Sequence, residues 1–111
     1  MAGKFTRIMY VELKSGYSDN GPAWITRVRF SRTMATAYFR DRVLKRGGGQ
    51  LIQGNFYDEE SGEEYWVSGP KKSAPDRHWA GGGLVSVDPD VAEDYWREVR
   101  GCEPPPNPLV A

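Results

Sequence analysis

The stretch that decides the fold is Trp24-Ile25-Thr26-Arg27-Val28-Arg29-Phe30-Ser31. Successive side chains of a β-strand point to opposite faces of the sheet. Trp24, Val28 and Phe30 therefore share one face, and the two arginines share the other. This alternation is typical of a strand with one buried and one solvated face, and it predicts that the arginines lie together in solvent.

Other segments before residue 88 show related patterns. Phe5–Leu13 carries apolar residues on both faces, which predicts a central strand. Glycine, asparagine and proline follow it, and these residues favour loops and tight turns. Gly47-Gly48-Gly49 indicates a mobile connector, because glycine loses more backbone entropy on folding than any other residue. The further strands that we expect span residues 36–40, 43–45, 50–57, 63–68 and 84–87.

One helix is expected after the last strand. Asp88 can cap its first turn, and Pro89 suits the first helical position. Arg97 and Arg100 complement the negative end of the helix dipole, and Gly101 can adopt the left-handed conformation that ends a helix. An apolar stripe at helical spacing predicts packing against the sheet. The stripe consists of Val91, Ala92, Tyr95, Trp96 and Val99.

Together these segments predict a mainly β protein of the α+β class. The expected architecture is a strongly bent antiparallel sheet or a small SH3-like barrel of five to six strands, with one C-terminal helix. We expect a single small domain over residues 1–101. Residues 102–111 contain four prolines and are expected to form a flexible, extended tail.

The composition indicates a globular protein. Aromatic residues make up 13% of the 111 residues, and a disordered chain contains fewer. No apolar run is long enough to span a bilayer, and the first residues do not resemble a signal peptide, so we expect no membrane contact and a cytoplasmic location. Cys102 is the single cysteine and cannot form an internal disulfide, which agrees with a reducing compartment.

The formal net charge of zero hides a division along the chain. Residues 1–50 hold ten lysines and arginines against three acids, a net charge of +7, whereas residues 51–111 hold five against twelve, a net charge of −7. A basic half can bind the phosphates of nucleic acid. Alternatively, the two halves face each other in the fold and neutralise each other.

Residues 64–83 form the predicted binding surface. Aromatic rings, cations, glycines and the only histidine are concentrated there, and loops of this composition commonly carry recognition. The leading hypothesis is a non-enzymatic interaction module that binds a protein partner through this surface, with Arg27 and Arg29 as a further part of it. The alternative is that Tyr65 and Trp66 point to opposite sides and pack a two-sided sheet. The predicted ligand-binding residues are Tyr65, Trp66, Lys71, Lys72, Arg77, His78 and Trp79.

Two other functions stay open, as does the oligomeric state. His78 could act as a general acid or base in a metal-independent ribonuclease or another phosphate-acting enzyme, with Lys71, Arg77 or Tyr65 assisting. The same residues could instead bind nucleic acid without cleaving it. The acidic run 58–64 lacks the ligand order of a calcium loop, and zinc would need cysteine or histidine partners, so we predict no metal and no cofactor.

Four stretches carry a family resemblance, namely residues 18–25, 54–58, 62–69 and 76–79. They resemble a family of small, uncharacterised bacterial proteins, and the likeness covers nearly the whole chain apart from the proline-rich tail. Sequences of this family often carry the automatic name 1-deoxy-D-xylulose-5-phosphate synthase. The thiamine diphosphate enzyme of that name is several times longer and needs a Gly-Asp-Gly motif, whereas Leu84 follows Gly82-Gly83 here. The resemblance implies a bacterial origin and a stand-alone domain, and no catalytic residue.

Overall fold

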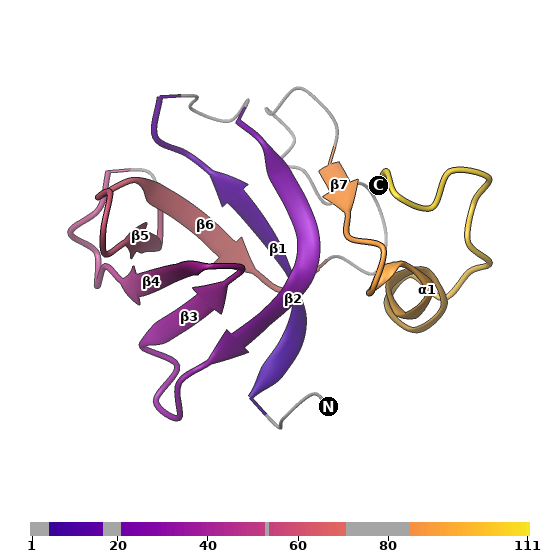
Figure 1. The fold of residues 1–111 in the computed structure, drawn as a ribbon, viewed down its shortest axis with the longest axis horizontal. Helices are drawn as coiled ribbons and strands as arrows, with labels where there is room; N and C mark the ends of the chain where they lie inside the picture. The colour runs from indigo at the N-terminus through magenta and orange to yellow at the C-terminus, as the bar shows by residue number, and fades with distance from the viewer. Residues whose placement is uncertain (1–4, 17–20, 53, 71–84) are drawn as a thin grey trace.

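The computed structural model describes residues 5–16, 21–52, 54–70 and 85–111. Six antiparallel strands form a closed barrel, to which a seventh strand and a short helix are added (Figure 1). This confirms the predicted fold class and shows that the sheet closes. The strands are β1 (Thr6–Leu13), β2 (Ala23–Phe30), β3 (Thr36–Phe39), β4 (Arg42–Arg46), β5 (Phe56–Asp58), β6 (Glu64–Ser68) and β7 (Val85–Val87).

The barrel closes through its two longest strands. Its strands pair in the order β1-β6-β5-β4-β3-β2, and the ladder between β1 and β2 completes the ring. The far end of β2 pairs with β3, whereas Ala23–Ile25 pair with β7. We expected antiparallel strands throughout, but β7 runs parallel to β2. Four strands separate β2 from β7 in the chain, so no hairpin fixes their relative direction.

Side-chain alternation along β1 and β2 builds two apolar clusters. Met9 and Val11 pack inside the barrel, whereas Ile8 and Tyr10 lie outside it. Apolar contacts on both faces confirm the central position predicted for this strand. The buried residues of the inner cluster are Val11, Val28, Phe30, Ala37, Phe39, Leu44, Phe56, Tyr65 and Val67.

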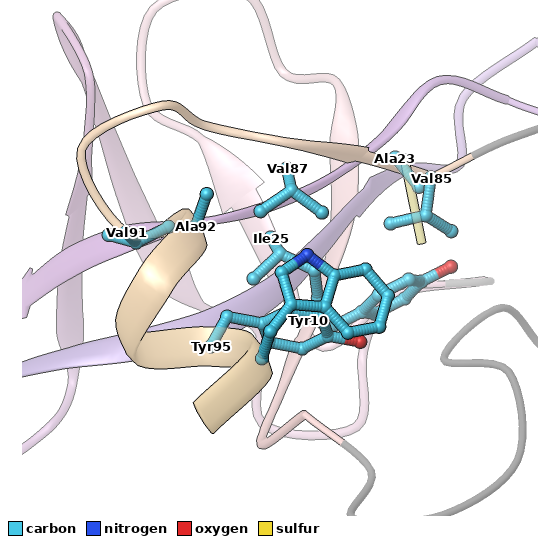
Figure 2. Packing of buried hydrophobic residues seen from close by; sticks show 9 residues of the cluster. Tyr10, Ala23, Ile25, Val85, Val87, Val91, Ala92 and Tyr95 are labelled. Atoms are coloured by element: carbon cyan, nitrogen blue, oxygen red, sulfur yellow. The ribbon is translucent and has the colours of Figure 1, made fainter. Parts of the chain in front are cut away.

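The outer cluster lies between the barrel wall and the helix. Figure 2 shows Tyr10 and Ile25 from the wall gathered with Val87 of β7 and Tyr95 of the helix. Of the predicted apolar stripe, four residues are buried and Val99 is partly buried, so the expected packing of the helix on the sheet is confirmed. No helix within the described ranges is long and apolar enough to cross a bilayer.

The helix begins later than predicted. It consists of α1 (Ala92–Asp94) and a π-helical segment (Tyr95–Val99), and no side chain caps its N-terminus. The expected cap at Asp88 is wrong, because the Asp88 carboxylate accepts hydrogen bonds from the Thr26 hydroxyl and the Arg40 guanidinium instead. The predicted stop is confirmed, since Gly101 has a left-handed φ of 68°.

The strand predicted over residues 50–57 is much shorter, because β5 begins only at Phe56. Gly48 and Gly49 adopt left-handed φ values of 64° and 86°, which turn the chain away from an extended course. The N–H groups of Ile52 and Gly54 then donate to the Glu64 carboxylate over 3.2 and 2.9 Å. The Glu64 carboxylate thus accepts hydrogen bonds from loop N–H groups that would pair with a neighbouring strand if this segment were extended.

The proline-rich tail lies against β7. Val110 forms an antiparallel bridge with Ser86, and the N–H of Val87 donates to the Leu109 carbonyl over 2.8 Å. The indole N–H of Trp96 also donates to the Pro108 carbonyl over 2.7 Å. An extended tail was expected, and in the structure it is part of the folded domain. Its flexibility in solution stays a prediction.

We expect Trp96→Phe to loosen the tail while the barrel stays folded. Phenylalanine keeps an aromatic ring in the outer cluster but cannot donate to Pro108, and one hydrogen bond contributes about 1 kcal/mol. Amide hydrogen exchange at Val87 should accelerate, whereas exchange at Val28, inside the barrel, should not change. Equal exchange at Val87 in both proteins would contradict the role given to the indole.

Candidate functional site

A hollow of about 410 Å³ opens where the ends of four barrel segments meet. Leu13 ends β1, Trp24 lies at the start of β2, and Tyr65 lies at the start of β6. The turn from β3 to β4 forms the remaining wall. We call this feature the mouth hollow, and it is lined by Leu13, Trp24, Phe39, Arg40, Asp41, Arg42, Glu63 and Tyr65.

The floor of the mouth hollow is aromatic. The rings of Trp24 and Phe39 have centroids 5.3 Å apart, and those of Phe39 and Tyr65 are 6.0 Å apart in an edge-on arrangement. Strand alternation directs these rings inward, since Tyr65 pairs with Leu13 across the ladder between β6 and β1. Phe39 and Tyr65 are buried in the barrel, so the half-buried Trp24 is the ring of this floor that a ligand's apolar side chain can reach.

The hydroxyl of Tyr65 stays protonated at neutral pH. Burial raises the pKa of Tyr65, and the carboxylates of Glu63 and Asp58 add to this effect, whereas the Arg42 guanidinium opposes it. A protonated phenol is a hydrogen-bond donor. The assisting catalytic role predicted for Tyr65 stays a prediction.

Arg40 occupies a backbone conformation that usually belongs to glycine, with a φ of 57° in the turn from β3 to β4. Its guanidinium lies 5.3 Å from the ring centroid of Trp24 and 5.2 Å from that of Phe39. It also forms an ion pair with Asp88 over 2.8 Å, yet the side chain is 48% exposed. Arg40 thus covers the aromatic floor and remains accessible to a ligand.

Arg42 forms the other basic wall of the hollow. Its guanidinium donates to Asp58 over 2.6 Å, and this hydrogen bond raises the pKa of Arg42 above its usual value. Asp58 is buried, and its second carboxylate oxygen accepts the N–H of Glu60 over 2.9 Å. A second hollow of about 580 Å³ adjoins here and shares Asp41 and Arg42 with the first.

The structure separates the two predicted aromatic ligands that it describes. Tyr65 is buried inside the barrel, whereas Trp66 lies on the outer face opposite Glu12 and is 41% exposed. The two rings therefore point to opposite sides of the sheet and do not share one surface. The other predicted ligand-binding residues lie outside the described residues, namely Lys71, Lys72, Arg77, His78 and Trp79.

Sequence reasoning missed a buried polar row on the outer face of β1. Glu12 is 0% exposed, its Oε1 accepts a hydrogen bond from the Tyr10 hydroxyl, and its Oε2 lies 3.0 Å from Lys14 Nζ. The sequence contains a signal for this row, because Tyr10, Glu12 and Lys14 are two residues apart and such residues of a strand share one face. The residues that line the mouth hollow are far apart in the sequence, so no regular spacing predicts that they meet.

Among the residues that the structure describes, three ion pairs join the basic half of the chain to the acidic half. Arg40 pairs with Asp88, Arg42 pairs with Asp58, and Arg27 lies 3.7 Å from a carboxylate oxygen of Asp90. The predicted neutralisation between the halves therefore holds for these arginines. It leaves several other cations of residues 1–50 without such a partner among the described residues.

Metal ligands and relatives give no further guide to function. In the part of the chain that the structure describes, no group of three or more histidine, cysteine, aspartate or glutamate residues is placed to hold a metal ion. No protein-family model, curated protein or solved structure matches the chain. The family resemblance of the sequence stays a prediction, and the function must be inferred from the geometry of the surface.

Proposed function

We propose that the protein is a non-enzymatic interaction module that binds a protein partner through the mouth hollow. The observation that supports this is the aromatic floor formed by Trp24, Phe39 and Tyr65 beside two half-exposed guanidinium groups. Tryptophan, tyrosine and arginine contribute most of the binding energy in protein interfaces. Among the described residues, the lining of the mouth hollow consists of aromatic, leucine, arginine and carboxylate side chains.

The lining also indicates what the partner presents. Arg40 and Arg42 each direct donors to a carboxylate of the protein, at Asp88 and Asp58, but a guanidinium has five N–H donors. The remaining donors can bind a carboxylate of the partner. We therefore expect a peptide segment with an aromatic or aliphatic side chain for the floor and an acidic residue next to it.

The alternative of a ribonuclease or another phosphate-acting enzyme stays a prediction, as do the bacterial origin and the cytoplasmic location. The residues that would catalyse the reaction, His78 with Lys71 and Arg77, lie outside the described residues.

Arg40→Gly should weaken binding strongly and leave the barrel folded. A left-handed conformation costs a residue other than glycine about 1–2 kcal/mol, so glycine relieves backbone strain. The greater freedom of glycine in the unfolded chain and the loss of a half-exposed ion pair, each worth about 1 kcal/mol or less, offset this gain. The melting temperature should therefore change little, whereas affinity for a peptide selected on the wild-type protein should fall at least tenfold.

Peptides selected from a random library on the wild-type protein provide the ligand, and calorimetry provides the affinity. Trp24→Ala should weaken binding as Arg40→Gly does, because it removes part of the floor. Arg97→Ala is the matched control, since Arg97 is an ion-paired, half-exposed arginine on the helix. The proposal fails if selected peptides lack the expected acidic and apolar pair, or if they bind Arg40→Gly as tightly as the wild type.

A further inference from the structure

Five cations surround the hairpin that joins β2 to β3. Arg29 lies in β2, and Arg7 follows Thr6, the ladder partner of Arg29, in β1. Arg32 lies in the turn itself, and the Arg46 guanidinium donates to a carbonyl of the same turn, that of Met34, over 3.3 Å. Lys45 pairs with Thr36 at the start of β3. We call Arg7, Arg29, Arg32, Lys45 and Arg46 the hairpin patch.

The cations of the hairpin patch have no ion-paired acid in the part of the chain that the structure describes, although Glu64 is the ladder partner of Tyr57 on the outer face. None of its five cations forms an ion pair with another described residue, in contrast to Arg27, Arg40 and Arg42. Lys45 donates only to the Thr36 hydroxyl over 3.2 Å. A surface that concentrates positive charge without internal partners attracts an anionic ligand, and several separated cations suit a ligand with several separated charges.

Two tyrosines share the outer face of the barrel with Arg29 and Lys45. Arg7 and Arg46 are the ladder partners of Val28 and Phe56 in the inner cluster, so they extend from the other side of their strands. The Arg29 guanidinium lies 3.9 Å from the ring centroid of Tyr38, its ladder partner, and Tyr57 is the ladder partner of Lys45. Directly paired residues of a ladder share a face, and this face is opposite to that of the buried Phe39 and Phe56. Neither tyrosine is fully buried. Cations and rings therefore alternate across four neighbouring strands.

We propose that the hairpin patch, together with Tyr38 and Tyr57, binds single-stranded nucleic acid. The cations bind successive phosphates, and the tyrosine rings stack on unpaired bases. A duplex fits less well, because its bases are already stacked on each other and expose no free ring face. The site uses other residues than the mouth hollow, so it does not depend on the proposed binding of a protein partner.

Fluorescence anisotropy with labelled oligo(dT), oligo(rU) and a DNA duplex tests this inference. Affinity for the single strands should fall steeply with salt, with a logarithmic slope of up to about −3.5 for five phosphate contacts at about −0.7 each. Tighter binding of oligo(dT) than of oligo(rU) would identify DNA as the ligand, and the reverse would identify RNA. No binding to either single strand at low salt, or equally tight binding of the duplex, would overturn the inference.

Two kinds of variant separate charge from stacking. Arg29→Ala and Lys45→Ala should each weaken binding and make the salt slope shallower by about 0.7. Tyr57→Ala should weaken binding about tenfold or more at an unchanged slope, because it removes a stacking ring. Tyr57→Phe keeps the ring and should bind normally, and Arg97→Ala, on the helix, should have no effect. Equal loss in Tyr57→Ala and Tyr57→Phe, or none in Tyr57→Ala, would refute stacking.

Discussion

Glu12→Ala is expected to lower the free energy of unfolding by about 3–5 kcal/mol, because the substitution removes one partner of a buried ion pair. The Glu12 carboxylate is buried, accepts the Tyr10 hydroxyl and lies 3.0 Å from Lys14 Nζ, which is itself buried. Urea unfolding followed by tryptophan fluorescence measures the change. For a domain of this size, such a loss removes a large part of the total stability.

The double variant Glu12→Leu with Lys14→Met is the control for this prediction. Apolar side chains of similar volume often replace a buried ion pair at little cost. The double variant should therefore be more stable than Glu12→Ala. The effects of Glu12→Leu and Lys14→Met on the free energy of unfolding, each measured alone, should not add up to that of the double variant. Strict additivity would show that Glu12 and Lys14 are not coupled, and the polar row would then have no role as a unit.

Asp58→Ala should cost about 2–3 kcal/mol, the second largest effect that we expect. The variant removes the acceptor of the Arg42 guanidinium and of the N–H groups of Glu60 and Ser61. Arg42 is 44% exposed, so water screens part of the ion pair and the loss stays below that for a fully buried pair. Glu59→Ala, at an exposed position of the same turn, should change the stability by less than about 0.5 kcal/mol.

The contribution of Asp58 should disappear in acid. Burial tends to raise the pKa of Asp58, but hydrogen bonds from Arg42 and from the backbone of Glu60 and Ser61 outweigh it and hold the pKa below 3.8. Because the folded-state pKa is lower than the unfolded-state value, the stabilisation is complete above about pH 4 and is lost as the pH falls through the folded-state pKa. The stability difference between wild type and Asp58→Ala should shrink over that range. A constant difference down to pH 2 would contradict this.

Local patterns predicted the barrel strands and the helix face well. Alternation around Trp24 and Phe30 correctly separated the inner face of β2 from its arginine face, and the apolar residues on both faces of Phe5–Leu13 correctly indicated a central strand. These features depend on neighbours two residues apart, whose relation is fixed by the strand itself. Where the residues of both faces are apolar, as in Phe5–Leu13, burial of both faces is expected.

Features that depend on distant partners could not be predicted in this way. Asp88 has every property of a helix cap, but Thr26 and Arg40 reach it from other strands and use its carboxylate. The loop before Phe56 reads as a strand until Glu64 is known to bind its N–H groups. The mouth hollow combines side chains from four separate segments, and only the closed barrel brings these together.

The position of the tail has a consequence for the solubility of the protein. β7 lies outside the ring and pairs with β2 on one side, so its backbone would be open on the other side without the tail. Unpaired strand backbone is a template on which other chains assemble into aggregates. Leu109, Val110 and Ala111 pair with this side of β7. The last residues of the chain therefore protect the protein against association through added strands.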